Sequence, residues 1–367
     1  MRIDRLDHSN KIFSKTNWKY IKKICAGKEK SMVSPILTLD LTSICNYKCS
    51  YCIDKGTVNH GEYKEIEWED LKYLLSDLRE HGCNCIELTG GGEPTLYSYF
   101  GEFLEFTAEA GYKLALVTNG SQLYKYAKNF KKSSIDWLRI SLDAATASTY
   151  NLIHGLAGCN NFNQVVEAIE YLAQDNVVGI SFIITNDNYN EIFQAAELAK
   201  KVHVKYFEIK PLLENELKDI YSYNTEVIKA IKEQLKKIEY LKDEEFSIIF
   251  PDSLSLCILE KTEKQKKYDE CKAAYLRTVL TPNGVYPCSY HRGMELKQVF
   301  PKTTEELLHY RNEVISKVNP QVMCNHYCAR NNINSIIYDI ISIQQAHPEM
   351  LDYLGWPIDY GEDVLWI

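Results

Sequence analysis

The chain has 367 residues, of which 45% are apolar, and this is enough for a large α/β domain with a smaller appendage. Its formal net charge of −8 argues against a nucleic-acid partner. Twelve cysteines, with no segment apolar enough for a signal peptide or a membrane span, indicate a cytoplasmic location and bound metal in place of disulfides.

The first 35 residues form a basic N-terminal extension, with nine Lys or Arg against three Asp or Glu. Such an arm could contact RNA or a membrane surface. We favour a solvated helix face, because Trp18, Ile21 and Ile24 recur at helical spacing.

Six short runs rich in β-branched residues follow from residue 36 and alternate with stretches of helical spacing. The expected strands are 36–41, 85–90, 113–119, 137–143, 178–185 and 206–211. The expected helices run from Trp68 up to Gly82 and over 97–110, 121–131, 162–174 and 189–201. Six such units predict an α/β fold over 36–215, a parallel sheet closed only in part, as a (β/α)6 TIM-like barrel. Ligands of such sheets bind at the carboxyl ends of the strands.

Three further segments complete the predicted organisation. Residues 216–249 are rich in charged side chains, and we expect them to form a helical connector. Residues 250–330 are expected to form a small α+β module, because a Pro-Asn-Gly turn joins two strand-like runs within 275–288. Residues 331–367 are expected to form a C-terminal tail with one helix.

Three cysteines lie just after the first expected strand, at the spacing Cys45-x3-Cys49-x2-Cys52. Structural zinc takes four ligands, and a disulfide would leave one thiol over. Three thiolates on one short loop could instead hold three corners of a cubane iron–sulfur cluster and leave the fourth iron open.

This cysteine spacing resembles the signature of radical S-adenosylmethionine (SAM) enzymes. Tyr51 supplies the aromatic residue that the family pattern places before the last cysteine. Three further stretches, each after one of the next three strands, resemble motifs of the same family: "TGGGEP" (89–94), "TNG" (118–120) and "SLD" (141–143). We expect all of them at one edge of the sheet.

The resemblance implies where SAM would bind. The open iron of a [4Fe–4S] cluster would chelate the methionine part of SAM. Gly90, Gly91 and Gly92 would let the backbone approach its ammonium group, with Glu93 as the charge partner. The side chains that would bind the ribose or the substrate, or would instead cap helices, are Asn119, Ser141 and Asp143.

The activity that the resemblance implies is reductive cleavage of SAM to a 5′-deoxyadenosyl radical, which abstracts a hydrogen atom from the substrate. An electron donor of the flavodoxin or ferredoxin type would be required. The alternative outside the enzyme class is a metal-binding scaffold without turnover.

A second cysteine group resembles the auxiliary-cluster domains called SPASM and twitch. We expect its ligands to be Cys271, Cys288, Cys324 and Cys328. The shorter twitch form, with one [4Fe–4S] cluster, fits better, because the middle Cys-x2-Cys portion of the SPASM pattern is missing. Three residues separate Gly284 from the second of these cysteines where the family usually has four, so Cys257 or His326 could replace one ligand. A zinc site with the same four cysteines is the alternative.

Four thiolates would saturate this second cluster, which favours electron relay during an oxidation. The leading substrate is a small polar molecule, sugar-like or aminocyclitol-like, because only 44 residues precede Cys45 and many peptide-modifying members carry a longer N-terminal domain. Modification of a ribosomally made peptide is the alternative. Lys210 and Arg292 could hold an anionic or polyhydroxylated group, or could be solvated or structural cations. Cys159 could return a hydrogen atom in an epimerisation, or could simply pack in the core.

Overall fold

The computed structural model describes residues 13–54, 63–132, 135–156, 161–213, 221–251, 254, 266–292, 294–296, 298–324 and 328–348. Its strands are β1 (Ile36–Leu39), β2 (Cys85–Leu88), β3 (Lys113–Thr118), β4 (Ile135–Ser141), β5 (Val178–Ile184), β6 (Tyr206–Pro211), β7 (Ser247–Ile249), β8 (Arg277–Thr281) and β9 (Gly284–Tyr286). Its longer helices are α2 (Lys15–Cys25), α3 (Trp68–Glu80), α4 (Phe100–Glu109), α5 (Leu123–Lys132), α6 (Ala147–His154), α7 (Asn161–Ala173), α8 (Ile192–Lys201), α9 (Thr225–Ile238), α11 (Thr304–Ser316) and α13 (Asn331–Ala346).

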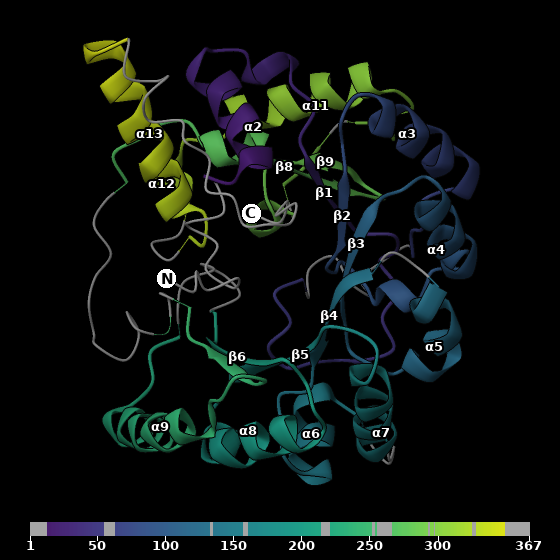
Figure 1. The fold of residues 1–367 in the computed structure, drawn as a ribbon, viewed down its shortest axis with the longest axis vertical. Helices are drawn as coiled ribbons and strands as arrows, with labels where there is room; N and C mark the ends of the chain where they lie inside the picture. Colours follow the sequence, from purple (N-terminus) through teal and green to yellow (C-terminus); the bar gives the residue numbers. More distant parts are fainter. Residues whose placement is uncertain are drawn as a thin grey trace. The chain divides into compact units, whose positions relative to one another are not determined.

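The strands form one sheet in the order β7-β6-β5-β4-β3-β2-β1-β8-β9. Neighbours from β3 to β7 pair in parallel, β1 pairs in parallel with β8, and β8 and β9 form an antiparallel hairpin. Helices follow the parallel strands one by one (Figure 1). The predicted α/β class and the partial barrel are therefore confirmed, and the six expected strands correspond to β1–β6.

Some elements lie beyond the prediction. The sequence analysis predicts no strand at β7 and no helix at α6 or α11, whereas it does predict the tail helix α13. Helix α6 is only eight residues long, but both of its ends carry ordinary signals. Thr146 accepts a hydrogen bond from the backbone of Thr149 at the start, and Gly155 follows the end in the left-handed conformation, with φ +65°.

Contacts divide the chain into two compact units. The first comprises Met1–Leu39, Ile66–Glu87 and Lys264–Ile367, and the second comprises Asp40–Glu65 and Leu88–Glu263. The predicted boundaries at residues 36, 216, 250 and 331 stay predictions.

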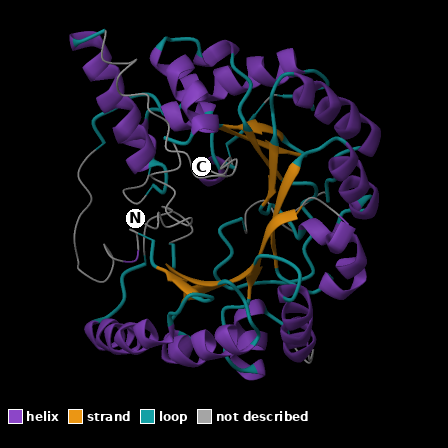
Figure 2. Cartoon of the chain, viewed as in Figure 1, coloured by secondary structure: helices purple, strands orange, loops and turns teal. Residues whose placement is uncertain are grey.

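In the second unit, the strands bury one face and leave the other partly open. Leu138 and Ile140 of β4 are fully buried, while Arg139 between them is half-buried. Strand β6 repeats this pattern, with Phe207 buried and Glu208 half-buried. Helices α6, α8 and α9 lie along one side of β5 and β6 (Figures 1 and 2). This alternation therefore gives the sheet an apolar face and a polar face.

In the first unit, Arg311 of α11 is a buried cation that organises backbone carbonyl groups. It is fully buried and donates to the carbonyl oxygens of Met32, Glu29 and Lys30 at 2.6, 3.0 and 3.1 Å. Those carbonyls lie in and just after the short 3-10 helix Glu29–Ser31, so Arg311 satisfies acceptors at its end.

Candidate functional site

The loop after β1 carries Cys45, Cys49 and Cys52, and its backbone is fastened in two places. On one side, the N–H groups of Gly92 and Glu93 donate to the carbonyl oxygens of Thr42 and Ile44, both at 2.8 Å. These bonds tie the glycine-rich loop after β2 to the segment that leads into the first cysteine. The predicted meeting of these two motifs at one edge is therefore visible within the second unit.

On the other side, the cysteine loop docks on the end of α6. The N–H groups of Lys48 and Ser50 donate to the carbonyl oxygens of His154 and Ile153 at 3.0 and 3.1 Å. Carbonyl groups in the last turn of a helix have no partner within the helix, so the loop completes the C-terminus of α6. Gly155 is required there, because a Cβ on it would lie 2.6 Å from the carbonyl oxygen of Lys48.

The neighbouring backbone leaves no room for a side chain at position 92, so a glycine is required there. A Cβ on Gly92 would lie 2.1 Å from the carbonyl oxygen of Ile44 and 2.7 Å from its nitrogen. Gly91 has φ +78° and would place a Cβ 3.1 Å from Asp40. Gly90 and Gly91 are half-buried. A ligand contact of Gly90, Gly91 or Gly92 stays a prediction, and the tight packing of Gly92 is the additional finding.

The carboxylate of Glu93 is turned into the protein and occupied by hydrogen bonds. Its Oε1 accepts from the hydroxyl groups of Thr95 and Thr118, both at 2.6 Å, and its Oε2 accepts from the backbone N–H of Asn119 at 2.8 Å. The side chain is 3% exposed, and burial raises its pKa. Glu93 therefore joins the ends of β2 and β3 from inside, and its predicted role as charge partner of a ligand stays a prediction.

Asn119 also contacts the cysteine loop. Its side-chain Nδ2 donates to Oδ1 of Asn46 at 2.9 Å, while its Oδ1 accepts from the backbone of Ser121 at 2.9 Å. Asn119 therefore links the end of β3 to the residue that follows Cys45. Ser141 ends β4, is half-buried and lies in register with Ser181 of β5.

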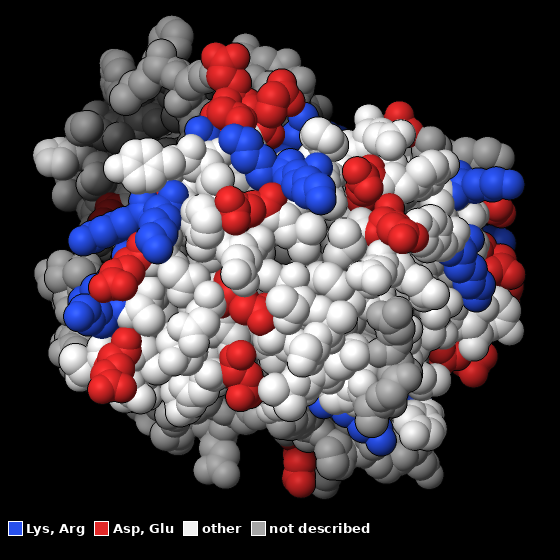
Figure 3. Space-filling view, turned by 90° about the horizontal axis from the view of Figure 1, so that it is seen from below, with Lys and Arg blue, Asp and Glu red and all other residues white. Residues whose placement is uncertain are grey.

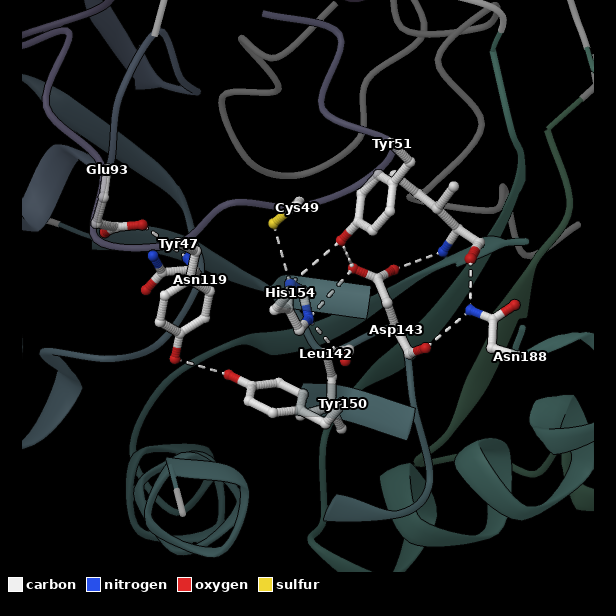
Figure 4. Close-up of polar contacts among 11 residues, drawn as sticks. Tyr47, Cys49, Tyr51, Glu93, Asn119, Leu142, Asp143, Tyr150, His154 and Asn188 are labelled. Carbon is white, nitrogen blue, oxygen red and sulfur yellow. Dashed lines mark hydrogen bonds and ion pairs between the residues drawn. The ribbon is translucent and has the colours of Figure 1, made fainter. Parts of the chain in front are cut away.

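A buried polar cluster surrounds Cys49. Figure 4 shows the thiol of Cys49 and the phenol of Tyr51 directed at the ring of His154. His154 Nδ1 lies 3.1 Å from the Cys49 Sγ, and its Nε2 lies 3.2 Å from the carbonyl oxygen of Leu142. A carbonyl oxygen only accepts, so Nε2 carries the proton and Nδ1 accepts in the neutral ring. Burial lowers the pKa of His154 to about 4, which keeps the ring neutral near pH 7.

Asp143 is the centre of this cluster. Its Oδ2 accepts from the hydroxyl of Tyr51 at 2.5 Å, and its Oδ1 accepts from the backbone N–H of Ile183 at 2.6 Å. Asn188 donates to the backbone oxygen of Asp143 at 2.8 Å and holds its positive φ of 54°. Burial raises the pKa of Asp143 to about 6. Tyr51 and Asp143, both predicted to bind the cofactor, thus lie in direct contact through a hydrogen bond between their side chains.

The donor set fits an iron–sulfur cluster. The three cysteines are half-buried thiols, and Cys49 interacts electrostatically with both Cys45 and Cys52. Burial raises the pKa of Cys45 to about 11 and also raises that of Cys49. Thiols buried in this way bind as thiolates only where a cation compensates the charge, which is what a metal cluster supplies.

The second cysteine group lies in the first unit, and its four thiols also gather. The pKa of Cys324 is raised to about 12. Burial is the largest cause, followed by the thiols of Cys328, Cys288 and Cys271. Each of the four is half-buried. Within the described ranges, no group of three or more His, Cys, Asp or Glu side chains was found that could hold a single metal ion. The thiolates of a cubane bind different irons, so they need not converge on one point.

Two side chains beside these thiols were not predicted. Asn334 of α13 is fully buried and donates its Nδ2 to the Sγ of Cys271 at 3.3 Å. His291 Nε2 lies 3.7 Å from the Sγ of Cys324. No motif signals Asn334, whereas His291 lies three residues after Cys288 and could have been considered as a ligand.

The remaining predicted residues are placed as follows. Lys210 lies on the half-buried face of β6, and its Nζ forms an ion pair with Glu208 at 3.0 Å. Arg292 is buried at the end of a short 3-10 helix after Cys288. Cys159, Cys257 and His326 lie outside the described residues.

Comparison with known proteins gives the family of the core. Residues 39–206 match the family model of the radical SAM superfamily. A probable GTP 3′,8-cyclase of Saccharolobus islandicus (strain M.16.4 / Kamchatka #3) is 27% identical over 209 residues, which are 56% of this chain and 66% of that protein. The GTP 3′,8-cyclase of Psychromonas ingrahamii is 30% identical over 135 residues, which are 36% of this chain and 39% of that protein. The chain thus spans about two thirds of the length of the first of these relatives.

Solved structures extend the likeness of the fold. SuiB of Streptococcus suis bound to the precursor peptide SuiA superposes with a TM-score of 0.62 and 17% identity, over 82% of this chain and 70% of that one. The protein anSMEcpe with bound AdoMet superposes with a TM-score of 0.58 and 19% identity, over 86% of this chain and 98% of that one. At these identities the likeness shows the fold.

Two surface features bear on partners. None of the helices that the structure describes is both long and apolar enough to cross a membrane. On the face drawn in Figure 3, acidic and basic side chains are interspersed, and the described Lys and Arg residues of that face form no continuous field.

Proposed function

Residues 39–206 are a radical SAM domain, and on this premise we propose that the chain oxidises or epimerises a small polar molecule. The radical SAM family uses SAM and a [4Fe–4S] cluster. Cys45, Cys49 and Cys52 would hold that cluster, and the half-buried Gly90 and Gly91 lie on the loop fastened to the cysteine segment. When bound, cluster and SAM together supply the radical chemistry that removes a hydrogen atom from a substrate.

The residues around the thiols prepare this site before any ligand binds. The hydrogen bonds to Thr42 and Ile44 set the entry of the cysteine loop, and α6 sets its middle. In the metal-free chain the thiol of Cys49 donates to His154, a proton that is lost when the thiolate binds iron, while Asp143 holds Tyr51 against the same ring. Contacts that hold metal ligands in place raise the affinity of the site for the metal, so that losing them lowers this affinity.

The observation that favours oxidation is the gathering of four thiols in the first unit. Cys271, Cys288, Cys324 and Cys328 are within electrostatic reach of one another, so they could saturate a second [4Fe–4S] cluster. A saturated cluster supplies an electron acceptor and no open iron for substrate. Loss of a hydrogen atom leaves one electron and one proton still to be removed from an alcohol, which such an acceptor would support.

Modification of a peptide is the second candidate. It is supported by the fold likeness to SuiB, solved with its precursor peptide SuiA, and to anSMEcpe, solved with a peptide and AdoMet. Each likeness is below 25% in identity, so we rank this candidate second. GTP is a further test compound, because curated relatives are named GTP 3′,8-cyclase.

The experiment is a reductive SAM-cleavage assay on the anaerobically reconstituted chain, with 5′-deoxyadenosine as the readout. Test compounds are a panel of polyols and aminocyclitols, GTP, and short peptides. The proposal expects the polyol or aminocyclitol panel to stimulate cleavage and to yield a product two hydrogens lighter or of inverted configuration.

Two outcomes overturn this proposal. Stimulation by peptides or GTP alone would move the function to those substrates. No 5′-deoxyadenosine above that of a Cys45/Cys49/Cys52→Ala variant would support a scaffold without turnover.

A further inference from the structure

The half-buried face of the parallel strands carries an ion cluster in which two cations share one oxygen atom. Arg139 of β4 and Lys210 of β6 each place a nitrogen 3.0 Å from Oε2 of Glu208. Arg139 and Glu208 alone would already balance each other in charge. Lys210 adds a second positive charge to the same carboxylate oxygen.

The accessible part of this cluster is cationic. The side chain of Lys210 is 30% exposed and that of Arg139 is 22% exposed, whereas that of Glu208 is 13% exposed. Asp143, the other carboxylate that acts on Lys210, is fully buried and accepts a hydrogen bond from Tyr51. The two cations are therefore the more exposed members of this cluster.

The register places Lys210 at the level of the cysteine loop. Lys210 is the partner of Ile183 in the β5–β6 pairing, and the backbone N–H of Ile183 donates to Asp143. Asp143 in turn holds Tyr51 of the cysteine loop. Lys210 thus lies at the carboxyl ends of the strands, where such sheets bind their ligands.

The charged form of Lys210 is disfavoured at this place when no ligand is bound. Burial, and then Arg139, lower the pKa of Lys210. An anion bound beside both cations would offset this repulsion, because it would add negative charge next to them in a partly desolvated place.

We propose that Lys210, together with Arg139, binds an anionic group, a carboxylate or a phosphate, of the substrate. This inference rests on the proposed function, since it deepens the description of the same site. The methionine carboxylate of SAM has the same chemistry, so the test must separate these two sources.

The test measures binding of two anions, inorganic pyrophosphate and malonate, to the reconstituted full-length chain by calorimetry. The variant is Lys210→Met, and Lys205→Met is the matched control. Lys205 precedes the same strand, pairs with Glu245 at 2.7 Å and is 46% exposed, so it offers an equivalent ion pair away from the cluster. SAM affinity is measured separately for every variant.

For at least one of the two anions, the expected result is a dissociation constant raised about tenfold or more in Lys210→Met, and unchanged in Lys205→Met. Lys210→Arg should restore binding, and Glu208→Gln should tighten it, because it removes the competing carboxylate. A purely structural ion pair would leave the native chain and all four variants equal in anion binding, which would overturn the inference.

Two other outcomes also overturn it: neither anion binds the native chain, or SAM affinity falls in Lys210→Met while anion affinity does not. The second of these would assign the cation to SAM. Anion binding requires no turnover, so it can stand even where the native chain fails to cleave SAM, which would refute the proposed function alone.

Discussion

Replacing Gly92 by alanine should damage the cysteine loop through a backbone collision. The new Cβ would lie 2.1 Å from the carbonyl oxygen of Ile44 and 2.7 Å from its nitrogen. These are backbone atoms next to Cys45, so no side-chain rotation relieves the overlap. The segment must move, and the hydrogen bonds from Gly92 to Thr42 and from Glu93 to Ile44, both 2.8 Å, would weaken or break.

The size of the effect follows from these contacts. A net hydrogen bond contributes about 0.5–1.5 kcal/mol, and forcing a methyl group into a filled place costs about 1–3 kcal/mol. We therefore expect Gly92→Ala to lower the free energy of unfolding by about 2–6 kcal/mol. Iron incorporation should fall as well, because the displaced segment leads directly into Cys45.

Urea denaturation of the metal-free protein and iron analysis after reconstitution measure the two effects. Gly101→Ala is the control, because Gly101 lies within α4 with nothing within 4 Å of an added Cβ. That change should leave iron unchanged and stabilise the chain by up to about 1 kcal/mol. A Gly92→Ala protein with native iron content and stability within about 0.5 kcal/mol of the native chain would refute the reasoning.

Three further substitutions test other contacts. His154→Phe keeps a ring but removes the hydrogen bond to a backbone carbonyl and the contact with Cys49. We expect the free energy of unfolding, measured by urea denaturation, to fall by about 1–3 kcal/mol, and the EPR spectrum of the reduced cluster to change. An unchanged spectrum would mean that the ring does not affect the thiolate. Asn334→Asp removes the N–H donated to Cys271 and adds a negative charge, so an EPR-monitored redox titration should find a lower potential for the auxiliary cluster, and an equal or higher potential would contradict this. Arg311→Met deprives three backbone carbonyls of a charged donor and should cost at least about 3 kcal/mol in urea denaturation, whereas a loss below about 1 kcal/mol would show that water replaces it.

The sequence predicted which loops meet, because strand ends in a parallel sheet share one edge, and their role as the site stays a prediction. The spacing of Cys45, Cys49 and Cys52 and the glycine run therefore led to one place. The direction of each side chain was harder to predict from the sequence. The role of Glu93 as charge partner of a ligand stays a prediction. That its oxygens accept from Thr95, Thr118 and Asn119 could not be predicted, because these contacts depend on loop conformation and not on spacing.

Contacts between distant segments were the hardest to foresee. His154 lies 105 residues from Cys49 in the chain, and only the docking of the cysteine loop on α6 brings them together. Thr146 and Gly155 do mark the ends of α6, so the helix could have been found, but its partner could not. Asn334 beside Cys271 is the same kind of contact, because no local pattern distinguishes it from a solvated amide.

Iron and sulfide per chain, after anaerobic reconstitution of the native protein and of the Cys45/Cys49/Cys52→Ala variant, test the central claim most directly. Each cysteine-ligated cubane carries four irons. A radical SAM core with a second, four-thiolate cluster predicts roughly eight irons in the native chain and roughly four in the variant. About four irons in the native chain and none in the variant would contradict the second cluster, and with it the electron relay on which the proposed oxidation depends.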